Sequence, residues 1–245
     1  LPPVAERVPA VPVIREMEAL GREFGVQGGR LRTMVTRARD VRLMVTWGYA
    51  RLVGYTETYT LEPDLLRDVE VEDGRRFTLK LRPGHRWSDG HPFTAADFRY
   101  YWEDVANNPD LSPSGPPAFL LVDGVYPTVS FPDDETVVYE WPAPNPRFLP
   151  TLAQARPPFI YRPAHYLKQF HAAYADEAAL SAMVEADRAR NWAQLHNSRD
   201  EMYDFDVPDL PTLQPWINLN ERNNQRYDLV RNPFFHRIDA RGVQL

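Results

Sequence analysis

The sequence predicts a mixed α/β fold of the α+β kind, because strand and helix signals alternate along one stretch of the chain. Every second residue from Phe77 to Leu81 is apolar, which is the period of a half-buried strand. A Pro-Gly pair then ends the strand. Thr94 lies three residues before Asp97, a spacing typical of the capped start of a helix. Apolar residues follow at helical spacing, so we expect a helix that begins near Ala95.

The part of the chain before this stretch is predicted to begin with an irregular arm. Residues 1–28 are rich in proline and polar residues, with a short helical pattern over 13–20. Residues 29–55 have the pattern of a strand, a loop and a helix. From residue 60 onward, short strands and helices alternate, interrupted by many prolines.

The part after residue 130 contains a predicted hairpin and two predicted helices. Asp133 and Asp134 lie between two runs of alternating apolar residues, so we expect them to form the turn of a hairpin. Pro163 is predicted as the first residue of a helix, a position that proline favours. Another helix is predicted over 176–192, and an extended linker with three prolines over 204–215.

Composition excludes several classes of protein. Hydrophobic residues make up 43% of the chain, a share typical of a globular domain. No run of about 18 apolar residues is present, so no transmembrane helix is predicted. The chain has no cysteine, which excludes disulfide scaffolds, thiol catalysis and cysteine-based zinc sites. Its net charge of −6 argues against nucleic acid as a partner, because binding to phosphates needs a basic surface.

A search for catalytic motifs finds none that identifies an enzyme. The sequence has no glycine-rich phosphate loop, no Gly-x-Ser-x-Gly motif and no His-Glu-x-x-His motif. His165 and His171 are six residues apart, which on a helix separates them by roughly 240°, so they do not share a face. We therefore predict no cofactor and no metal. A carboxylate pair for glycoside hydrolysis remains open, because nothing in the sequence selects one pair.

Several motifs spread along the chain resemble those of a known family. The most specific is the stretch from Phe77 to Phe98, with Trp87-Ser88-Asp89-Gly90 between the predicted strand and helix. The others are Gly28–Val35, Tyr49–Tyr55, Leu61–Leu66, Glu135–Trp141, Leu229–Phe235 and Asp239–Leu245. In their order these motifs resemble the bacterial extracellular solute-binding proteins of family 5, the peptide/nickel-binding class that serves ABC importers.

The resemblance implies a lobe of the class II periplasmic-binding-protein type with an inserted α+β subdomain. It places the first part of lobe I, with the arm, in residues 1–60, the inserted subdomain in 61–200 and a return to lobe I in 201–245. Family members usually continue into a second lobe, so we expect that the C-terminal lobe is missing here. The start lacks a signal-peptide pattern, and we expect a processed or trimmed mature form.

The resemblance also implies a function. Two lobes would close at a hinge around a peptide or a similar oligomeric solute, without catalysis, and deliver it to a membrane permease. The expected protein is a monomer in the periplasm, or an extracellular one that is tethered to the membrane. The alternative is a periplasmic hydrolase that acts on carbohydrate through an unidentified carboxylate pair.

The expected ligand site comes from the same resemblance. Its residues are Arg37, Ala38, Arg39 and Asp40 in the loop after the first strand, Tyr49 at a helix end, and Trp216. An arginine in that loop is suited to pair with a ligand carboxylate, and Asp40 with an amino group. Trp216 either stacks on the ligand or lies in the core, and Arg42 and Arg51 are interpreted as part of a solvated face.

Overall fold

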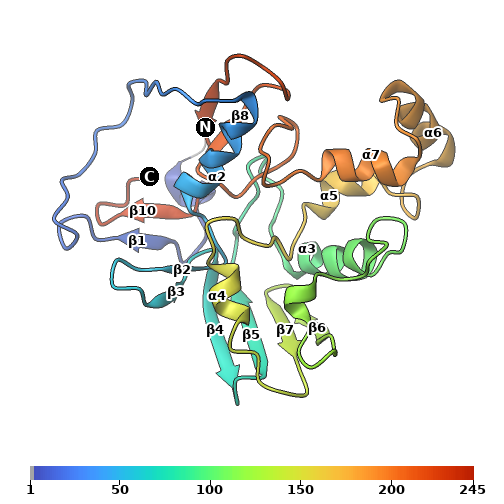
Figure 1. Cartoon of the computed structure of the whole chain (residues 1–245). Helices are drawn as coiled ribbons and strands as arrows, with labels where there is room; N and C mark the ends of the chain where they lie inside the picture. Colours follow the sequence, from blue (N-terminus) through green and yellow to red (C-terminus); the bar gives the residue numbers. More distant parts are fainter. Residues whose placement is uncertain (1–2) are drawn as a thin grey trace.

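The structure is a computed structural model that describes residues 3–245, and it confirms the mixed α/β fold (Figure 1). The strands are β1 Val13–Arg15, β2 Val53–Tyr55, β3 Leu61–Pro63, β4 Leu66–Glu72, β5 Arg76–Leu81, β6 Thr128–Asp133, β7 Thr136–Glu140, β8 Trp216–Asn218, β9 Leu229–Arg231 and β10 Arg237–Asp239. The α-helices are α1 Val4–Arg7, α2 Leu43–Gly48, α3 Ala95–Arg99, α4 Phe148–Leu152, α5 Ala164–Leu167, α6 Glu177–Ala186 and α7 Trp192–Arg199. The remaining helical turns are the 3₁₀ segments η1 Ala38–Arg42, η3 Ala118–Leu120 and η4 Lys168–Phe170, and the π-helix η2 Tyr100–Ala106.

The largest sheet is antiparallel with the order β4-β5-β7-β6, at the bottom of Figure 1. The predicted strand is β5, one of the two inner strands, and the predicted hairpin is β6–β7. Leu79 and Leu81 on β5 and Val137 and Tyr139 on β7 are fully buried, because the alternating pattern directs their side chains to one face. α3 packs against β6 and β7 and continues directly into η2.

The start of α3 is fixed by hydrogen bonds that connect it to two other segments. Thr94 Oγ1 accepts the Ala96 N–H at 3.3 Å, and Asp97 Oδ2 accepts the Thr94 N–H at 3.0 Å, which confirms the predicted capped start. The buried indole of Trp87 also donates to Asp97 Oδ2 at 3.1 Å. The Ala164 N–H at the start of α5 donates to Asp97 Oδ1 at 3.1 Å. One carboxylate therefore joins three parts of the chain.

Three two-stranded sheets surround α2 and the upper end of the large sheet. β1 pairs in parallel with β10, β2 pairs antiparallel with β3, and β8 pairs antiparallel with β9. The β1–β10 pair brings the beginning and the end of the chain side by side, on the left of Figure 1. The helices α5, α6 and α7 form a separate group on the right of the figure.

Three sequence predictions on secondary structure are wrong. The helical pattern over 13–20 contains the strand β1 instead, because Val13 and Ile14 find a partner in β10. No strand forms over 28–35, where Leu31 and Met34 are 89% and 96% exposed and no neighbouring strand offers hydrogen bonds. The helix over 176–192 ends after α6, because Arg188 adopts a left-handed conformation with φ of 55°.

The remaining helix predictions are close to the observed boundaries. Pro163 is the residue immediately before α5 rather than its first residue. Asn191 begins a further helix, α7, by accepting the Gln194 N–H on its side chain at 2.8 Å. The predicted linker over 204–215 contains no helix or strand.

Candidate functional site

The expected ligand residues Arg37 to Asp40 lie at the beginning of the helical segment formed by η1 and α2. Asp40 accepts the Arg37 N–H on its carboxylate at 3.1 Å, and this bond closes the first turn of η1. Arg37 and Arg39 are exposed, while Ala38 and Asp40 are half-buried. None of the described residues forms an ion pair with Arg37 or Arg39, so both guanidinium groups face solvent.

Tyr49 follows the last residue of α2 in a left-handed conformation, with φ of 45°. Its hydroxyl donates to the Ala153 carbonyl at 2.8 Å and accepts the Tyr55 N–H at 3.2 Å. Both bonds are internal to the protein. The residue is half-buried, and the Arg51 guanidinium lies over its ring, 4.9 Å from the centroid, so one face of the ring is covered as well.

The end of α2 touches the start of β8, and Figure 1 shows these two elements next to each other. A Cβ atom on Gly48 would lie only 2.7 Å from Pro215 Cδ, so glycine is required for this close approach. Two tryptophans flank the contact, Trp47 before Gly48 and Trp216 after Pro215. Their side chains are 55% and 41% exposed, so the alternative that Trp216 lies in the core is wrong.

The structure therefore brings together only some of the expected site residues. Tyr49 and Trp216 lie near the Gly48–Pro215 contact. Asp40 is nine residues before Tyr49, at the other end of η1 and α2, which for helical residues is a separation on the order of 14 Å. A ligand that reached both groups would have to extend along the whole helical segment.

Trp47 was not among the site residues predicted from the sequence, although its helical spacing from Val41 and Val45 is informative. Val41 and Val45 are buried in a small core with Phe205, so they define the inner face of the helical segment. Trp47 is two residues after Val45, which on a helix turns its side chain about 200° away from that face. Together with the burial of these two valines, the spacing indicates an outward-pointing tryptophan.

Arg51 fixes the segment that faces α2 and does not belong to a solvated face, which corrects the sequence interpretation. Its side chain is 1% exposed and donates to four backbone carbonyls. The acceptors are Gln154 at 2.9 Å, Ala50 at 2.9 Å, Val45 at 3.0 Å and Ala155 at 2.7 Å. These bonds satisfy the guanidinium without a carboxylate and hold residues 154 and 155 against α2.

Asp64, the residue after β3, connects Arg51 with residues 236 and 237 at the start of β10. It is 1% exposed and accepts the Arg51 N–H at 3.0 Å, His236 Nε2 at 2.8 Å, and Arg237 Nε and Nη2 at 2.9 and 2.6 Å. Burial raises the pKa of the Asp64 carboxyl, yet His236 and Arg237 lower it more, so that it lies far below its usual range. Arg237 also donates to the Tyr49 carbonyl at 2.6 Å, which ties the end of α2 to β10.

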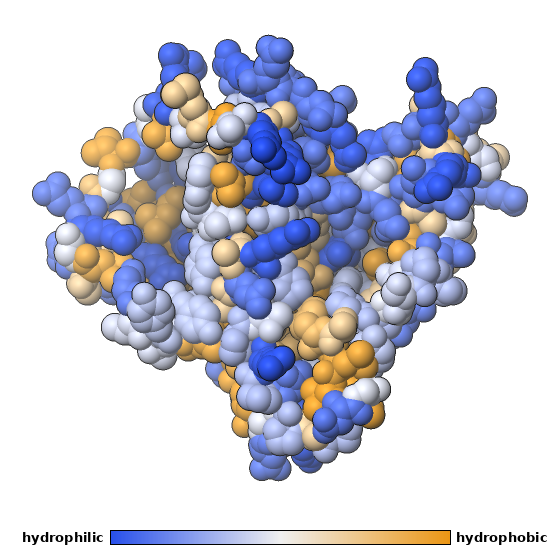
Figure 2. Space-filling view, in the orientation of Figure 1, coloured by the Kyte–Doolittle hydropathy of each residue, from blue (hydrophilic) through white to orange (hydrophobic). Residues whose placement is uncertain are grey.

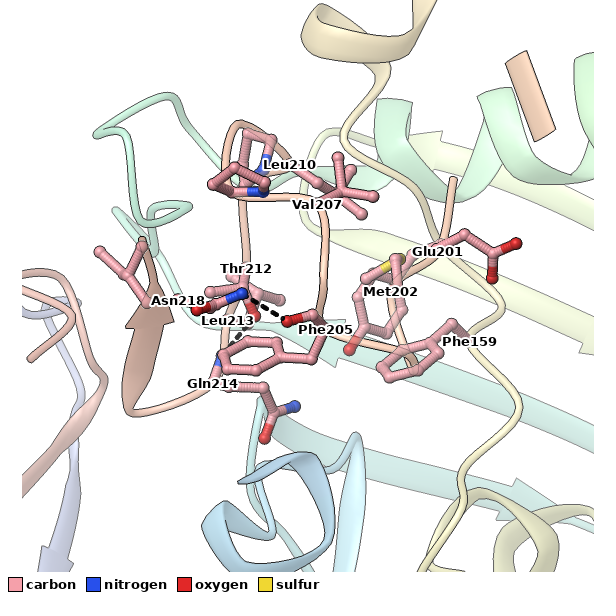
Figure 3. A pocket seen from close by; sticks show the side chains of 14 residues that line it. Phe159, Glu201, Met202, Phe205, Val207, Leu210, Thr212, Leu213, Gln214 and Asn218 are labelled. Atoms are coloured by element: carbon pink, nitrogen blue, oxygen red, sulfur yellow. Dashed lines mark hydrogen bonds between the residues drawn. The ribbon is translucent and has the colours of Figure 1, made fainter. Parts of the chain in front are cut away.

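A narrow pocket lies behind these elements, and Figure 3 shows the side chains around it. Phe205 and Gln214 face each other across it, and Asn218 donates to the Phe205 carbonyl at 3.0 Å. Its volume of about 10 Å³ leaves room for about one water molecule. The pocket is thus part of the core and not a ligand site.

Within residues 3–245, no group of three or more His, Asp and Glu side chains is arranged to hold a metal ion. In the same range, no helix combines the length and the apolar character that a membrane crossing requires.

Several known proteins are similar to this chain. A periplasmic alpha-galactoside-binding protein of Rhizobium meliloti is 28% identical over all of this chain and 35% of its own length. A solved oligopeptide-binding protein OppA is 32% identical with a TM-score of 0.84, over 100% of this chain and 37% of its own. The periplasmic binding protein MelB of Agrobacterium fabrum, solved with stachyose, is 27% identical with a TM-score of 0.70, again over 100% and 37%.

These relatives are much longer than the chain, which spans about a third of their length. The family model for the middle part of bacterial extracellular solute-binding proteins, family 5, matches residues 60–236. This range contains the large sheet, the buried Asp64 and Asp97, and Trp216. The resemblance noted in the sequence is thereby confirmed, and the chain belongs to the bacterial extracellular solute-binding proteins of family 5.

Proposed function

We propose that the protein captures an oligosaccharide in the periplasm, or outside the cell while tethered to the membrane, and delivers it to the permease of an ABC importer. Membership in family 5 supports the role in solute capture. The relatives that match the whole chain include an alpha-galactoside-binding protein and a protein solved with stachyose, which supports a sugar ligand. We include in this proposal that the protein is a monomer without catalytic activity, and that a second lobe closes over the ligand.

The observation that carries this proposal is the pair of exposed tryptophans around the Gly48–Pro215 contact. Large aromatic side chains are usually buried, and exposed ones that gather in one place indicate a binding surface. A tryptophan face packs against the apolar C–H groups of a sugar ring without requiring charge on the ligand. Trp47 and Trp216 come from different elements, and the close contact of their neighbours fixes their relative position.

Removal of either tryptophan is expected to weaken sugar binding without loss of stability. In the full-length gene product, Trp47→Ala and Trp216→Ala should each lower the affinity for stachyose about tenfold, equivalent to about 1.4 kcal/mol. Because both side chains are about half exposed, the melting temperature without sugar should stay nearly unchanged. Calorimetric titration measures the affinity, and Tyr59→Ala, which removes an aromatic ring that is 86% exposed on another loop, is the matched control. Equal affinities for all four proteins would contradict the proposal.

A peptide is the second candidate ligand. It is supported by the likeness to OppA and by the charged side chains of Arg37, Arg39 and Asp40, which are suited to hold the charged ends of a peptide.

For a peptide ligand, Asp40→Ala is expected to weaken binding at least tenfold, about 1.4 kcal/mol, because a ligand amino group would lose its partner. The variant should leave stachyose binding unchanged. Thermal shift measurements with panels of peptides and of oligosaccharides distinguish the two candidates, since ligand binding raises the melting temperature by mass action. Release of monosaccharides during the incubation would instead indicate the hydrolase alternative.

A further inference from the structure

Besides the tryptophan pair, the surface has a hollow beside residues 153–155, the segment that Tyr49 and Arg51 hold by hydrogen bonds. It is a groove next to α4 with a volume of about 570 Å³, within the range of small-molecule sites. We call it the α4 groove and define it by Phe119, Leu121, Asn145, Arg147, Gln154 and Arg156. Figure 2 shows the molecule from the side of α4, where hydrophilic and hydrophobic surface lie next to each other.

The charges in the α4 groove are all of one sign. Arg147 and Arg156 line it, and no acidic residue does, although the whole chain carries a net charge of −6. Neither guanidinium forms an ion pair or a hydrogen bond with the described residues. The Arg156 guanidinium lies over the Tyr203 ring, 4.6 Å from its centroid, and this contact restricts the side chain while its N–H groups stay available. Two unpaired guanidinium groups around one hollow favour an anion.

An asparagine with an unpaired amide nitrogen also lines the groove. Asn145 is only 4% exposed, and its Nδ2 has no hydrogen-bond partner among the residues that the structure describes. A buried amide N–H group without an acceptor costs roughly 1–3 kcal/mol. The Nδ2 atom is closed off from solvent, so a ligand oxygen would reach it only after the amide turns toward the groove.

The other walls of the groove are partly apolar. Phe119, Leu121, Pro157 and Pro158 line it together with the polar Thr151 and Gln154. Inorganic anions gain nothing from such walls, whereas the carbon skeleton of an organic acid gains free energy from the apolar area removed from water. We propose that the α4 groove binds a small organic acid, with its carboxylate at Arg147 and Arg156 and its apolar body on Phe119.

The backbone on one side of this groove is held in place before any ligand arrives. The carbonyls of residues 153, 154 and 155 accept hydrogen bonds from Tyr49 and Arg51, and these contacts separate the groove from the tryptophan pair. Gln154 and Arg156 therefore extend from a fixed segment, which lowers the entropy that binding costs. The two sites share no side chain, so one can be lost while the other remains.

The test uses phenylacetate and its neutral amide, phenylacetamide, with the full-length gene product in calorimetric titrations. Phenylacetate is expected to bind at least tenfold more tightly than phenylacetamide, with an affinity that falls as salt is added. Arg147→Gln and Arg156→Gln should each weaken phenylacetate binding at least fivefold. Arg156→Lys should restore only part of the loss, because lysine keeps the charge but not the planar fork. Arg67→Gln, at an exposed arginine outside the groove, is the matched control and should change nothing.

Several results would overturn the assignment. Equal affinities for phenylacetate and phenylacetamide would exclude a charge-dependent site, and unchanged binding in both glutamine variants would place it elsewhere. Inorganic phosphate that binds more tightly than phenylacetate would show that the apolar walls take no part. Since the two arginines are exposed, their variants should retain the wild-type melting temperature. Trp47→Ala should leave phenylacetate binding intact, so a failure here is distinguishable from a failure of the sugar proposal.

Discussion

Replacement of Asp64 by alanine is expected to lower the free energy of unfolding by about 3–5 kcal/mol, because it leaves a buried arginine side chain without its carboxylate. Asp64 and His236 are almost fully buried, and the Arg237 side chain is only 13% exposed. Without Asp64, four N–H groups from three residues lose their acceptor. Urea denaturation of the full-length gene product measures the loss.

The matched control for this prediction is Asp68→Ala. Asp68 lies four residues later, is exposed on β4, and accepts only the N–H of its neighbour Val69. Its replacement should change the free energy of unfolding by less than about 0.5 kcal/mol. Similar losses for the two variants would mean that the Asp64 cluster does not stabilise the fold in the way its geometry indicates.

Asp64 also predicts a dependence of stability on pH. Its pKa in the folded chain lies well below the value of about 3.9 for an unfolded chain, so at low pH the unfolded chain binds the proton first. The stability contributed by Asp64 is therefore present above about pH 4 and lost as the pH falls below it. The non-titrating variant Asp64→Asn should lose this dependence, so its deficit relative to the wild type should shrink between pH 5 and pH 3.

The sequence predicts those parts of the fold whose signals are local. The strand at Phe77–Leu81 and the helix after Thr94 depend on alternation and on a cap, and both form where expected. The region around Val13 depends on a partner more than 220 residues away in the chain, and no local pattern reveals that pairing with Arg237. Tertiary contacts thus override the weak helical pattern there.

The site was less accessible to sequence reasoning than the fold. Arg51 looked like one of several surface arginines, and only the three-dimensional structure shows that backbone carbonyls surround it. The α4 groove combines Phe119, Asn145 and Arg156, which share no motif and meet only after folding. Trp47 is different, because its spacing from Val41 and Val45 indicates an outward-pointing side chain once these two valines are known to be buried.

Replacement of Asp97 by alanine is the second change with a large expected effect, a loss of about 3 kcal/mol or more at pH 4, where the folded chain holds the carboxyl protonated. A helix cap alone contributes about 0.5–2 kcal/mol. Asp97 also accepts the N–H groups of Trp87 and Ala164, and each buried donor left without an acceptor costs about 1–3 kcal/mol. Thr94→Ala is the control at the same helix start, because it removes only the bond to Ala96 and should cost about 1 kcal/mol.

The pH dependence that arises from Asp97 has the opposite sign to that of Asp64. Burial raises the pKa of Asp97 to about 6. The hydrogen bonds that Thr94, Ala164 and Trp87 donate and the attraction of His165 lower this pKa, but by less than burial raises it. Between about pH 4 and 6 the folded chain therefore holds the proton more tightly than the unfolded chain, and stability falls as the pH rises through this range. The difference from the unfolded value of about 3.9 corresponds to about 3 kcal/mol.

Relative to Asp97→Asn, which does not titrate, the wild type should gain stability when the pH is lowered from 7 to 4. A constant difference between the two proteins over this range would show that the Asp97 carboxylate stays ionised in the folded chain, with its three N–H donors outweighing burial.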